Sequence, residues 1–150
     1  MTDTMKDILV PIGSAAEAPR AAERAIKLYG AGAARVHLLN VQRPLPRHVS
    51  RFFPRSELQA FHHEAGMAVL APAARALDAA GVPHDDHVIV GHAAEAIVEF
   101  AEHHHCADIV LDTASKGLLS ILHAGSIGSQ VRHLMRAQAD ATAPGVQAIP

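Results

Sequence analysis

The chain has 150 residues and a formal net charge of −2, which is enough chain for one domain with its own core and too little for two. Its 13 Lys and Arg residues are scattered, which excludes the basic surface of a nucleic-acid-binding protein, and no apolar run approaches the roughly 20 residues that span a bilayer. The single cysteine, Cys106, cannot form an internal disulfide and suits a reducing compartment. We therefore expect one cytoplasmic domain over residues 1–150 that binds neither nucleic acid nor membrane.

The first third of the chain predicts a strand, a helix and a second strand. The apolar run DILVPI at residues 7–12 suits a strand that is buried on both faces. Alanines and other apolar residues recur at helical spacing over residues 16–29, and Gly30 supplies a stop signal. The run VHLLNV at residues 36–41 predicts the second strand.

The middle of the chain predicts a crossover followed by a long helix. Residues 42–54 contain three prolines and predict an irregular connection. Ser56, with Gln59 three residues later, resembles a capping box, so a helix is expected from residue 56 to about residue 80, where Gly81 ends it. Pro72 lies inside this helix and should kink it or split it.

The remaining segments continue the alternation, with a strand at residues 87–90, a helix at 93–104, a strand at 108–111 and a helix at 126–136. This order predicts an α/β fold: a single doubly wound domain with a mostly parallel sheet of four or five strands and helices on both faces. Residues 137–150 form an uncertain C-terminal tail, in which residues 146–149 are either a short fifth strand or a frayed end.

The loop at residues 113–125 is where function is expected, because ligands of open α/β sheets bind at the carboxyl ends of strands. The helix that follows begins at Gly125 and Ser126, and a helix start presents unpaired N–H groups and the positive end of its dipole. We therefore expect phosphate or sulfate to bind weakly there. Ser126 is better explained as the N-cap than as a nucleophile, because no G-x-S-x-G motif surrounds it.

Four segments in matching order resemble the universal stress protein family: ILVPIGS, VHLLNV, VGHAAEAIVEFAEHHHCADIVLDT and AGSIGSQVRHL. The resemblance covers most of the chain, from Lys6 to about His133. It implies a small doubly wound α/β fold of the adenine nucleotide alpha hydrolase-like type, a stress-response role and, in most members, a dimer. The family contains nucleotide-binding and non-binding groups.

The nucleotide site that the resemblance implies is only half present. The candidate nucleotide or anion cleft comprises Ile12, Gly13, Val41, Asp112, Thr113, Ser115, Gly125, Ser126 and Ile127. Nucleotide-binding members carry an Asp where this chain has Gly13, and glycines of their phosphate loop are replaced here by Asp112 and Ser115. The helix start at Gly125, Ser126 and Ile127 is retained, as is Val41, where the family contacts adenine through the backbone.

The substitution by Asp112 has a calculable consequence for a phosphate ligand. An ionised carboxylate about 4 Å from a phosphate oxygen costs about 4 kcal/mol per charge pair at an effective dielectric near 20, which is roughly three decades of affinity. Lys116 could partly offset this charge, and a Mg²⁺ ion could use Asp112 as a ligand beside the phosphate oxygens.

The other reactive side chains favour structural interpretations. Consecutive histidines on a helix point about 100° apart, so the run from His103 to His105 is interpreted as a solvated, partly C-capping end rather than as metal ligands. Cys106 is interpreted as a small buried hydrophobe. His92 and His123 could line the cleft but have no visible catalytic partner. No catalytic residue and no metal ligand are therefore expected.

Two functional hypotheses remain open. The first is a non-enzymatic stress-response module with an impaired nucleotide cleft, no cofactor and an unknown protein partner. The second is an ATP-binding or adenine-nucleotide-binding protein that uses Mg²⁺ and hydrolyses ATP slowly. In either case we expect a homodimer. Twelve residues separate His133 from Val146, where the family has a shorter link, so we expect its interface to draw on helix faces and residues 42–54 as well as the tail.

Overall fold

The structure is a computed structural model that describes residues 6–32 and 34–110. Within these residues the strands form one parallel sheet in the order β3-β2-β1-β4. The strands are β1 (Lys6–Pro11), β2 (Ala34–Gln42), β3 (His84–Val90) and β4 (Asp108–Ile109). The helical elements are η1 (Ala15–Glu17), α1 (Ala18–Gly32), α2 (Arg47–Ser50), α3 (Arg55–Ala79) and α4 (Ala93–His103).

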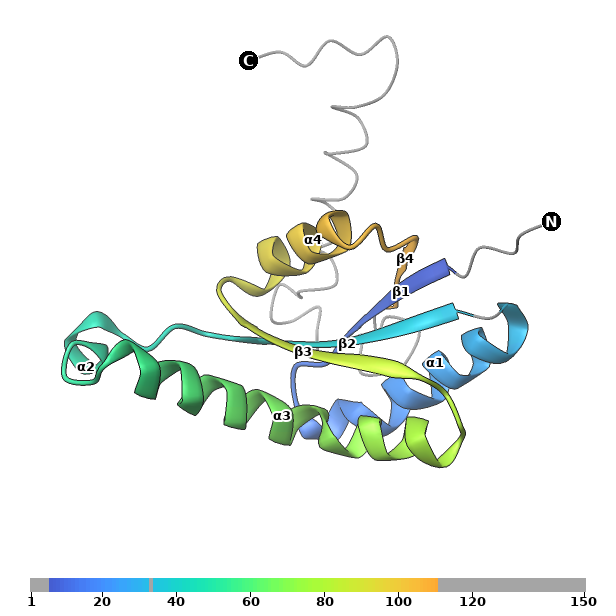
Figure 1. The fold of residues 1–150 in the computed structure, drawn as a ribbon, viewed down its shortest axis with the longest axis horizontal. Coiled ribbons are helices and arrows are strands. Elements are labelled where there is room, and N and C mark those ends of the chain that lie inside the picture. Colours follow the sequence, from blue (N-terminus) through green and yellow to red (C-terminus); the bar gives the residue numbers. More distant parts are fainter. Residues whose placement is uncertain (1–5, 33, 111–150) are drawn as a thin grey trace, which may run out of the picture.

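Helices cover both faces of the sheet, as the order of elements predicted. Figure 1 shows α1 and α3 on one face and α4 on the other. Ile8 and Val10 of β1 are buried against α1 and α3, whereas Leu9 between them is buried against α4. This alternation follows from the two-residue period of a strand and gives the sheet a core on each side. The predicted doubly wound α/β fold is confirmed.

The first helix begins and ends at different residues from those expected. A short 3₁₀ turn, η1, precedes α1, and α1 continues to Gly32, so Gly30 lies inside the helix instead of ending it. Four buried alanines of this helix face the core, namely Ala18, Ala21, Ala22 and Ala25. A helix whose apolar face consists of small alanine side chains is stabilised by packing on the sheet. This packing outweighs the weak tendency of one glycine to end a helix.

The long helix α3 differs from expectation at its start. It begins at Arg55 after Pro54, without a side-chain cap hydrogen bond, so the predicted capping box at Ser56 is wrong. Pro72 lies inside the helix without splitting it. The end is as predicted: Gly81 has a φ of 72°, and the N–H groups of Gly81 and Val82 donate to the carbonyls of Asp78 and Leu77.

Three other boundaries need correction. The crossover at residues 42–54 contains the short helix α2 and is therefore not wholly irregular. β3 begins at His84, three residues before the predicted start. β4 ends at Ile109 within the described residues, and Leu111, the predicted helix at 126–136 and the tail at 137–150 lie outside them. No helix among the described residues is both long and apolar enough to cross a membrane.

Candidate functional site

The order of the strands determines where a ligand cleft opens. β1, β2 and β3 follow one another in one direction, and the chain then returns to place β4 on the other side of β1. The carboxyl ends of β1 and β4 therefore flank a topological switch point, which is where open α/β sheets bind ligands. Ile12 and Gly13 follow β1 directly at this point, and Val41 lies near the end of the neighbouring β2.

A chain of side-chain hydrogen bonds joins the ends of β1, β2 and α3 beside this point. The amide nitrogen of Asn40 donates to the carbonyl of Ile12 at 2.8 Å, and that of Gln42 donates to Asn40 Oδ1 at 2.7 Å. His62 Nδ1 donates to Gln42 Oε1 at 3.3 Å. Asn40 and His62 are buried. These polar groups satisfy one another, and their long-range pairing gave no signal in the sequence.

Glu17 occupies the space beside Gly13. Its Oε1 accepts a hydrogen bond from the N–H of Gly13 at 3.1 Å, and its Oε2 accepts one from the hydroxyl of Ser14 at 3.4 Å. A Cβ atom added to Gly13 would lie 3.4 to 3.6 Å from this carboxylate. Sequence reasoning missed Glu17, although its position in the turn after β1 was visible. The turn thus places a carboxylate beside Gly13 from a residue four positions later.

Val41 directs its peptide groups toward the end of β1. The carbonyl of Leu39 accepts from the N–H of Ile12 at 2.9 Å, so the peptide groups of Leu39 face β1. Alternate residues of a strand address the same neighbour, and Val41 therefore faces the same side, beyond the last residue of β1. This orientation leaves the Val41 backbone beside the candidate cleft.

The described residues thus bring together Ile12, Gly13 and Val41 of the candidate cleft. The other candidates, Asp112, Thr113, Ser115, Gly125, Ser126 and Ile127, lie outside the described residues, as do Lys116 and His123. Their approach to the first three residues stays a prediction. His92, which was named as able to line the cleft, is an exposed residue that directly precedes α4.

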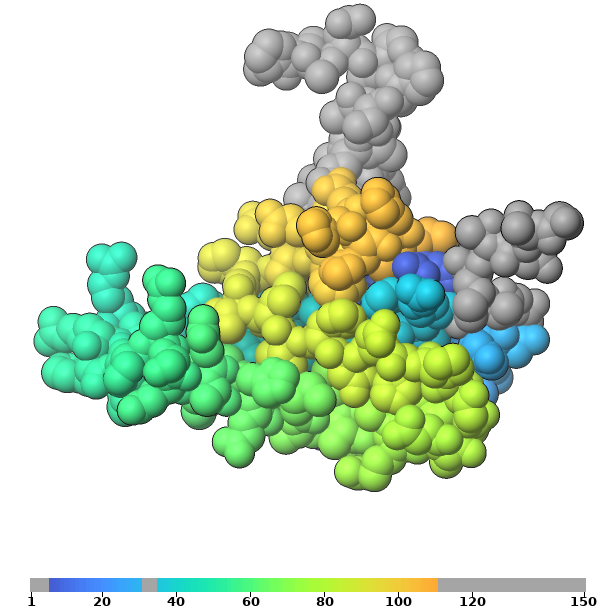
Figure 2. Space-filling view, viewed as in Figure 1, coloured from blue at the N-terminus to red at the C-terminus, as the bar shows by residue number. Residues whose placement is uncertain are grey.

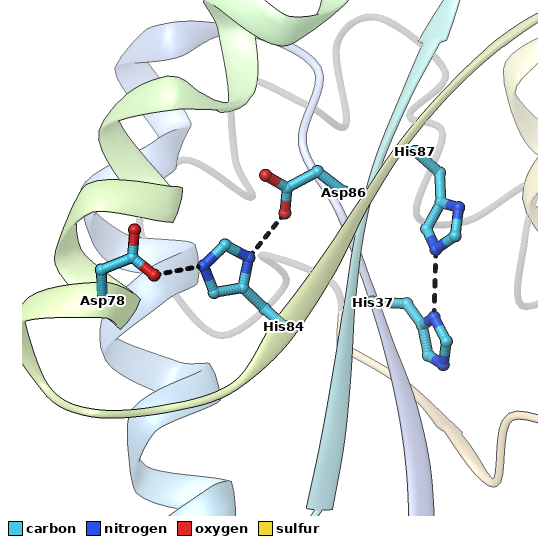
Figure 3. Close-up of polar contacts among 5 residues, drawn as sticks. All are labelled: His37, Asp78, His84, Asp86 and His87. Atoms are coloured by element: carbon cyan, nitrogen blue, oxygen red, sulfur yellow. Dashed lines mark hydrogen bonds and ion pairs between the residues drawn. The ribbon is translucent and has the colours of Figure 1, made fainter.

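A second polar group lies on the α4 face of the sheet, toward the amino ends of β2 and β3. His37 Nδ1 of β2 lies 3.1 Å from His87 Nε2 of β3. Figure 3 shows the two rings pointing toward each other. The nearby Asp85 completes a set whose ligand atoms all lie within 4.8 Å of one another. Phe100 and His104 of the α4 end pack on the two histidines, with Phe100 and His104 stacked at 3.9 Å between ring centres.

Two histidines of this second group have lowered pKa values. Burial lowers the pKa of His87, and the neighbouring His37 lowers it further. Burial and His37 likewise lower the pKa of His104. The 3.1 Å contact of His37 with His87 needs a proton on one nitrogen and a lone pair on the other. The lowered pKa of His87 favours its neutral imidazole, the form in which histidine binds a metal.

His84 forms a separate ion-pair cluster on the opposite face of β3. Its Nδ1 lies 2.7 Å from Asp86 Oδ1 and its Nε2 lies 2.8 Å from Asp78 Oδ1, and Figure 3 shows the ring between the two carboxylates. Burial lowers the pKa of His84, but hydrogen bonds to Asp78 and Asp86 outweigh burial and raise it overall. Only an imidazolium offers two N–H donors, so this cluster ties the end of α3 to β3 most strongly in the charged form.

The histidine run at the end of α4 agrees partly with its interpretation. His103 and His105 are exposed, and His105 follows the C-cap residue His104 in the left-handed conformation, with a φ of 54°. His104 instead stacks on Phe100. Cys106 packs against the core on the α4 side, and burial followed by the charge of Asp7 raises its pKa to about 11. This thiol is protonated at neutral pH, which agrees with the predicted structural role.

Comparisons with known proteins agree with this architecture. Residues 4–137 match the model of the universal stress protein family. A universal stress protein solved in complex with cAMP is similar at a TM-score of 0.59 and 19% identity, covering 85% of this chain and 88% of that chain. A family member from Burkholderia pseudomallei has a TM-score of 0.59 and 22% identity, covering 84% and 95%.

A third similar structure is a universal stress protein from Archaeoglobus fulgidus in complex with dAMP. Its TM-score is 0.55 at 15% identity, and the match covers 87% of this chain and 90% of that chain. A search of functionally curated proteins gives no significant match. At these identities the likeness establishes the fold, and the chemistry of the cleft has to be argued from this chain's own residues.

Proposed function

Because the chain belongs to the universal stress protein family, we propose that it is a non-enzymatic stress-response module with an impaired nucleotide cleft. The observation that carries this proposal is that polar groups at the ends of β1 and β2 already form hydrogen bonds with other groups of the protein. The N–H of Gly13 is bonded to Glu17, and the amide of Asn40 is bonded to the carbonyl of Ile12. A ligand would have to replace these hydrogen bonds, and each replacement returns little net free energy.

The second support is the charge expected at the far side of the cleft. Asp112 stands where nucleotide-binding relatives have a loop glycine, and Ser115 replaces a second one. With Glu17 beside Gly13, a nucleotide would meet carboxylates from two segments. We therefore expect no cofactor to be retained, and a physiological role through an unknown protein partner.

The alternative is an adenine-nucleotide-binding protein that uses ATP with Mg²⁺ and hydrolyses it slowly. Two observations favour it: similar structures are complexes with cAMP and with dAMP, and the peptide groups of Val41 face the mouth of the cleft. In this alternative the helix start at Gly125, Ser126 and Ile127 holds the phosphates. Weak binding of phosphate or sulfate there is compatible with both functions.

Titration with ATP and Mg²⁺ separates the two functions. We expect the full chain to bind with a dissociation constant weaker than about 10 μM, and to carry no co-purified adenine nucleotide in native mass spectrometry. An Asp112→Gly variant should bind up to about three decades more tightly, because one repelled charge pair is removed. Binding by the unchanged chain below about 10 μM would establish the alternative instead.

Two further variants make this titration specific. Glu23→Gln changes the charge on the exposed surface of α1 by the same amount as Asp112→Gly and should leave affinity unchanged. Restoring the family's Asp at position 13 requires Gly13→Asp together with Glu17→Gln, because the new side chain would otherwise meet the Glu17 carboxylate. Combined with Asp112→Gly, this variant should bind more tightly than Asp112→Gly alone.

We also propose that the protein is a cytoplasmic homodimer. Three phenylalanines of the β2–α3 crossover and the first turns of α3 are exposed, with Phe52 68% exposed and with Phe53 and Phe61 about half exposed. Figure 2 shows this segment projecting from one end of the molecule, in teal and green. Exposed aromatic side chains that gather on one projection are typical of an association surface. This supports the expected contribution of residues 42–54 to the interface.

A further inference from the structure

The register of β2 and β3 places three potential metal ligands on one face of the sheet. His37 lies directly across from Asp85, and His87 follows two residues later on β3, across from Leu39. Residues two apart on a strand point to the same face, and neighbouring strands lie about 4.8 Å apart. One imidazole of β2 therefore meets an imidazole and a carboxylate of β3 on the α4 side.

The distance between the two imidazole nitrogens is close to that in a tetrahedral metal centre. His37 Nδ1 and His87 Nε2 are 3.1 Å apart, and one ligand atom from each of His37, Asp85 and His87 lies within 4.8 Å of the other two. Two nitrogens bound to one zinc ion at about 2.0 to 2.1 Å are about 3.3 Å apart in a tetrahedron. The two imidazoles thus already have the spacing that one ion requires, and binding would draw the Asp85 carboxylate closer to them.

An independent observation at His37 points to the same ligand. Its Nε2 is buried and has no hydrogen-bond partner among the described residues, although Asp7 Oδ2 lies 3.5 Å away. His37 itself is only 5% exposed. A metal-bound imidazole characteristically directs its second N–H at a carboxylate, which fixes the tautomer and the ring. Coordination through Nδ1 would leave the proton on Nε2, facing Asp7.

The ligand set is open to solvent at one of its members. Asp85 is exposed on β3, an edge strand of the described sheet, whereas His37 is buried. Beside the set, a groove of about 570 Å³ is lined by Glu99, Glu102, Phe100 and His104 among others, and its two glutamates favour the approach of a cation. His104 has its ring centre 5.5 Å from that of His87, so the lining of this groove reaches the ligand set.

We propose that His37 Nδ1, Asp85 and His87 Nε2 bind one divalent transition-metal ion, for which Zn²⁺ is the main candidate. Asp7 would be the hydrogen-bond partner of His37. Two imidazoles with one carboxylate suit zinc and its neighbours in the first transition row, whereas Mg²⁺ and Ca²⁺ prefer oxygen ligands alone. This site is separate from the nucleotide cleft at the carboxyl ends of the strands, so it does not depend on the proposed function.

Calorimetric titration of the metal-free full chain with ZnCl₂ tests the site. We expect one zinc ion per chain and a rise in the melting temperature on saturation. His87→Gln and Asp85→Asn remove ligands that are not fully buried and should weaken this binding by roughly 100-fold or more. Asp7→Asn keeps all three ligands and should weaken it by roughly 10-fold, because only the partner of His37 changes.

Matched controls distinguish the site from binding by surface histidines, of which the chain has several. His63→Gln and His103→Gln change exposed imidazoles outside the ligand set and should leave the titration unchanged. Co²⁺ in place of Zn²⁺ should give the visible absorption of a tetrahedral centre in the unchanged chain and in His63→Gln, but not in His87→Gln. Equal zinc affinity and equal Co²⁺ spectra in the unchanged chain, Asp85→Asn and His87→Gln would overturn the proposal.

Discussion

His105 adopts a backbone conformation that a side chain makes costly. Its φ of 54° is the left-handed conformation that ends α4, where the N–H of His105 donates to Glu102 and that of Cys106 to Ala101. This conformation costs a residue with a Cβ atom about 1 to 2 kcal/mol, and glycine avoids the cost. We expect His105→Gly to raise the free energy of unfolding by about 0.5 to 1 kcal/mol in urea denaturation, after glycine's extra unfolded-state entropy is subtracted.

His103 provides the matched comparison for that measurement. It is an exposed histidine two residues earlier, at the last position of α4. Glycine at a helical position is unfavourable, so His103→Gly should lower the free energy of unfolding by up to about 1 kcal/mol. If both variants lower stability equally, the left-handed conformation of His105 contributes nothing measurable.

The ion-pair cluster of His84 makes stability depend on pH. The pKa of His84 is raised above its ordinary 6.5, because the carboxylates of Asp78 and Asp86 outweigh the effect of burial. A group whose folded pKa is raised contributes stability that is complete below its unfolded pKa, about 6.5, and is lost as the pH rises through the folded pKa. The stability difference between the unchanged chain and His84→Gln should therefore shrink as the pH rises above 6.5.

The sign of this dependence separates His84 from other histidines. His87 and His104 have lowered pKa values, so their contribution is lost as the pH falls and is opposite in sign. Subtracting the curve of His84→Gln from that of the unchanged chain isolates His84. Asp78→Asn removes the exposed partner and should retain part of the effect through Asp86. A difference that grows with rising pH would contradict the assignment.

At the scale of elements, α3 approaches β3 closely at Gly66. A Cβ atom at this position would lie 2.4 Å and 2.6 Å from the two methyl groups of Val88. Valine is stiff about χ1 and cannot turn both methyl groups away. We expect Gly66→Ala to destabilise the protein by about 1 to 3 kcal/mol in urea denaturation, although alanine favours a helix.

Gly30 and Val88 supply the controls for this contact. Gly30 also lies inside a helix but has open space where a Cβ would be, so Gly30→Ala should stabilise the protein by up to about 1 kcal/mol. Val88→Ala should reduce the cost of Gly66→Ala when the two are combined, with a coupling of about 0.5 to 3 kcal/mol. If the effects of Gly66→Ala and Val88→Ala on the free energy of unfolding are strictly additive, α3 and β3 can move apart at this contact without loss of stability.

Strands and helices with strong periodicity could be predicted, but their boundaries depend on packing. The strand β1, with its apolar run ILV, and the apolar helix α4 could be predicted from their own residues alone. Gly30 was expected to end a helix, but packing of the alanine stripe carries α1 two residues further. Ser56 looked like a cap, but the chain already turns into α3 at Arg55. Local signals are worth about 1 kcal/mol, which tertiary contacts readily exceed.

The side-chain clusters could not be predicted from local patterns. His37 and His87 are 50 residues apart, and their contact depends on the register of β2 against β3. A shift of that register by one residue would turn one of them to the other face. The chain of Asn40, Gln42 and His62 has the same origin. The switch point between β1 and β4 follows from the order of elements and could be predicted, whereas the loop residues of the candidate cleft lie outside the described residues, so the cleft itself stays a prediction.

At the scale of the whole molecule, the exposed phenylalanines of the crossover and the start of α3 predict how the proposed homodimer dissociates. If Phe52 and Phe61 lie in the interface, Phe52→Ser with Phe61→Ser should raise the dimer dissociation constant by roughly 100-fold, because buried aromatic residues dominate interface energy. Light scattering over a concentration series measures this shift. Leu28→Ser changes an exposed apolar residue of α1 and serves as the control.

Truncation tests the contribution of the tail to the same proposed dimer. A chain that ends at Asp140 lacks residues 146–149, which were predicted to be a short strand or a frayed end. We expect the truncated chain to remain dimeric at a somewhat higher dissociation constant. A monomeric full chain would refute the homodimer, and complete dissociation after truncation would move the interface to the tail.

Within the described residues β3 lies at one edge of the sheet, and this position bears on aggregation. An unpaired strand edge is a template on which another chain can add a strand, and repeated addition builds fibrils. Two copies of β3 paired in parallel and in register would set Asp85 against Asp85 and Asp86 against Asp86. Like charges directly opposite one another destabilise such a pair. The first half of β3 therefore resists sheet extension from one molecule to the next, and it does so with a carboxylate on each face.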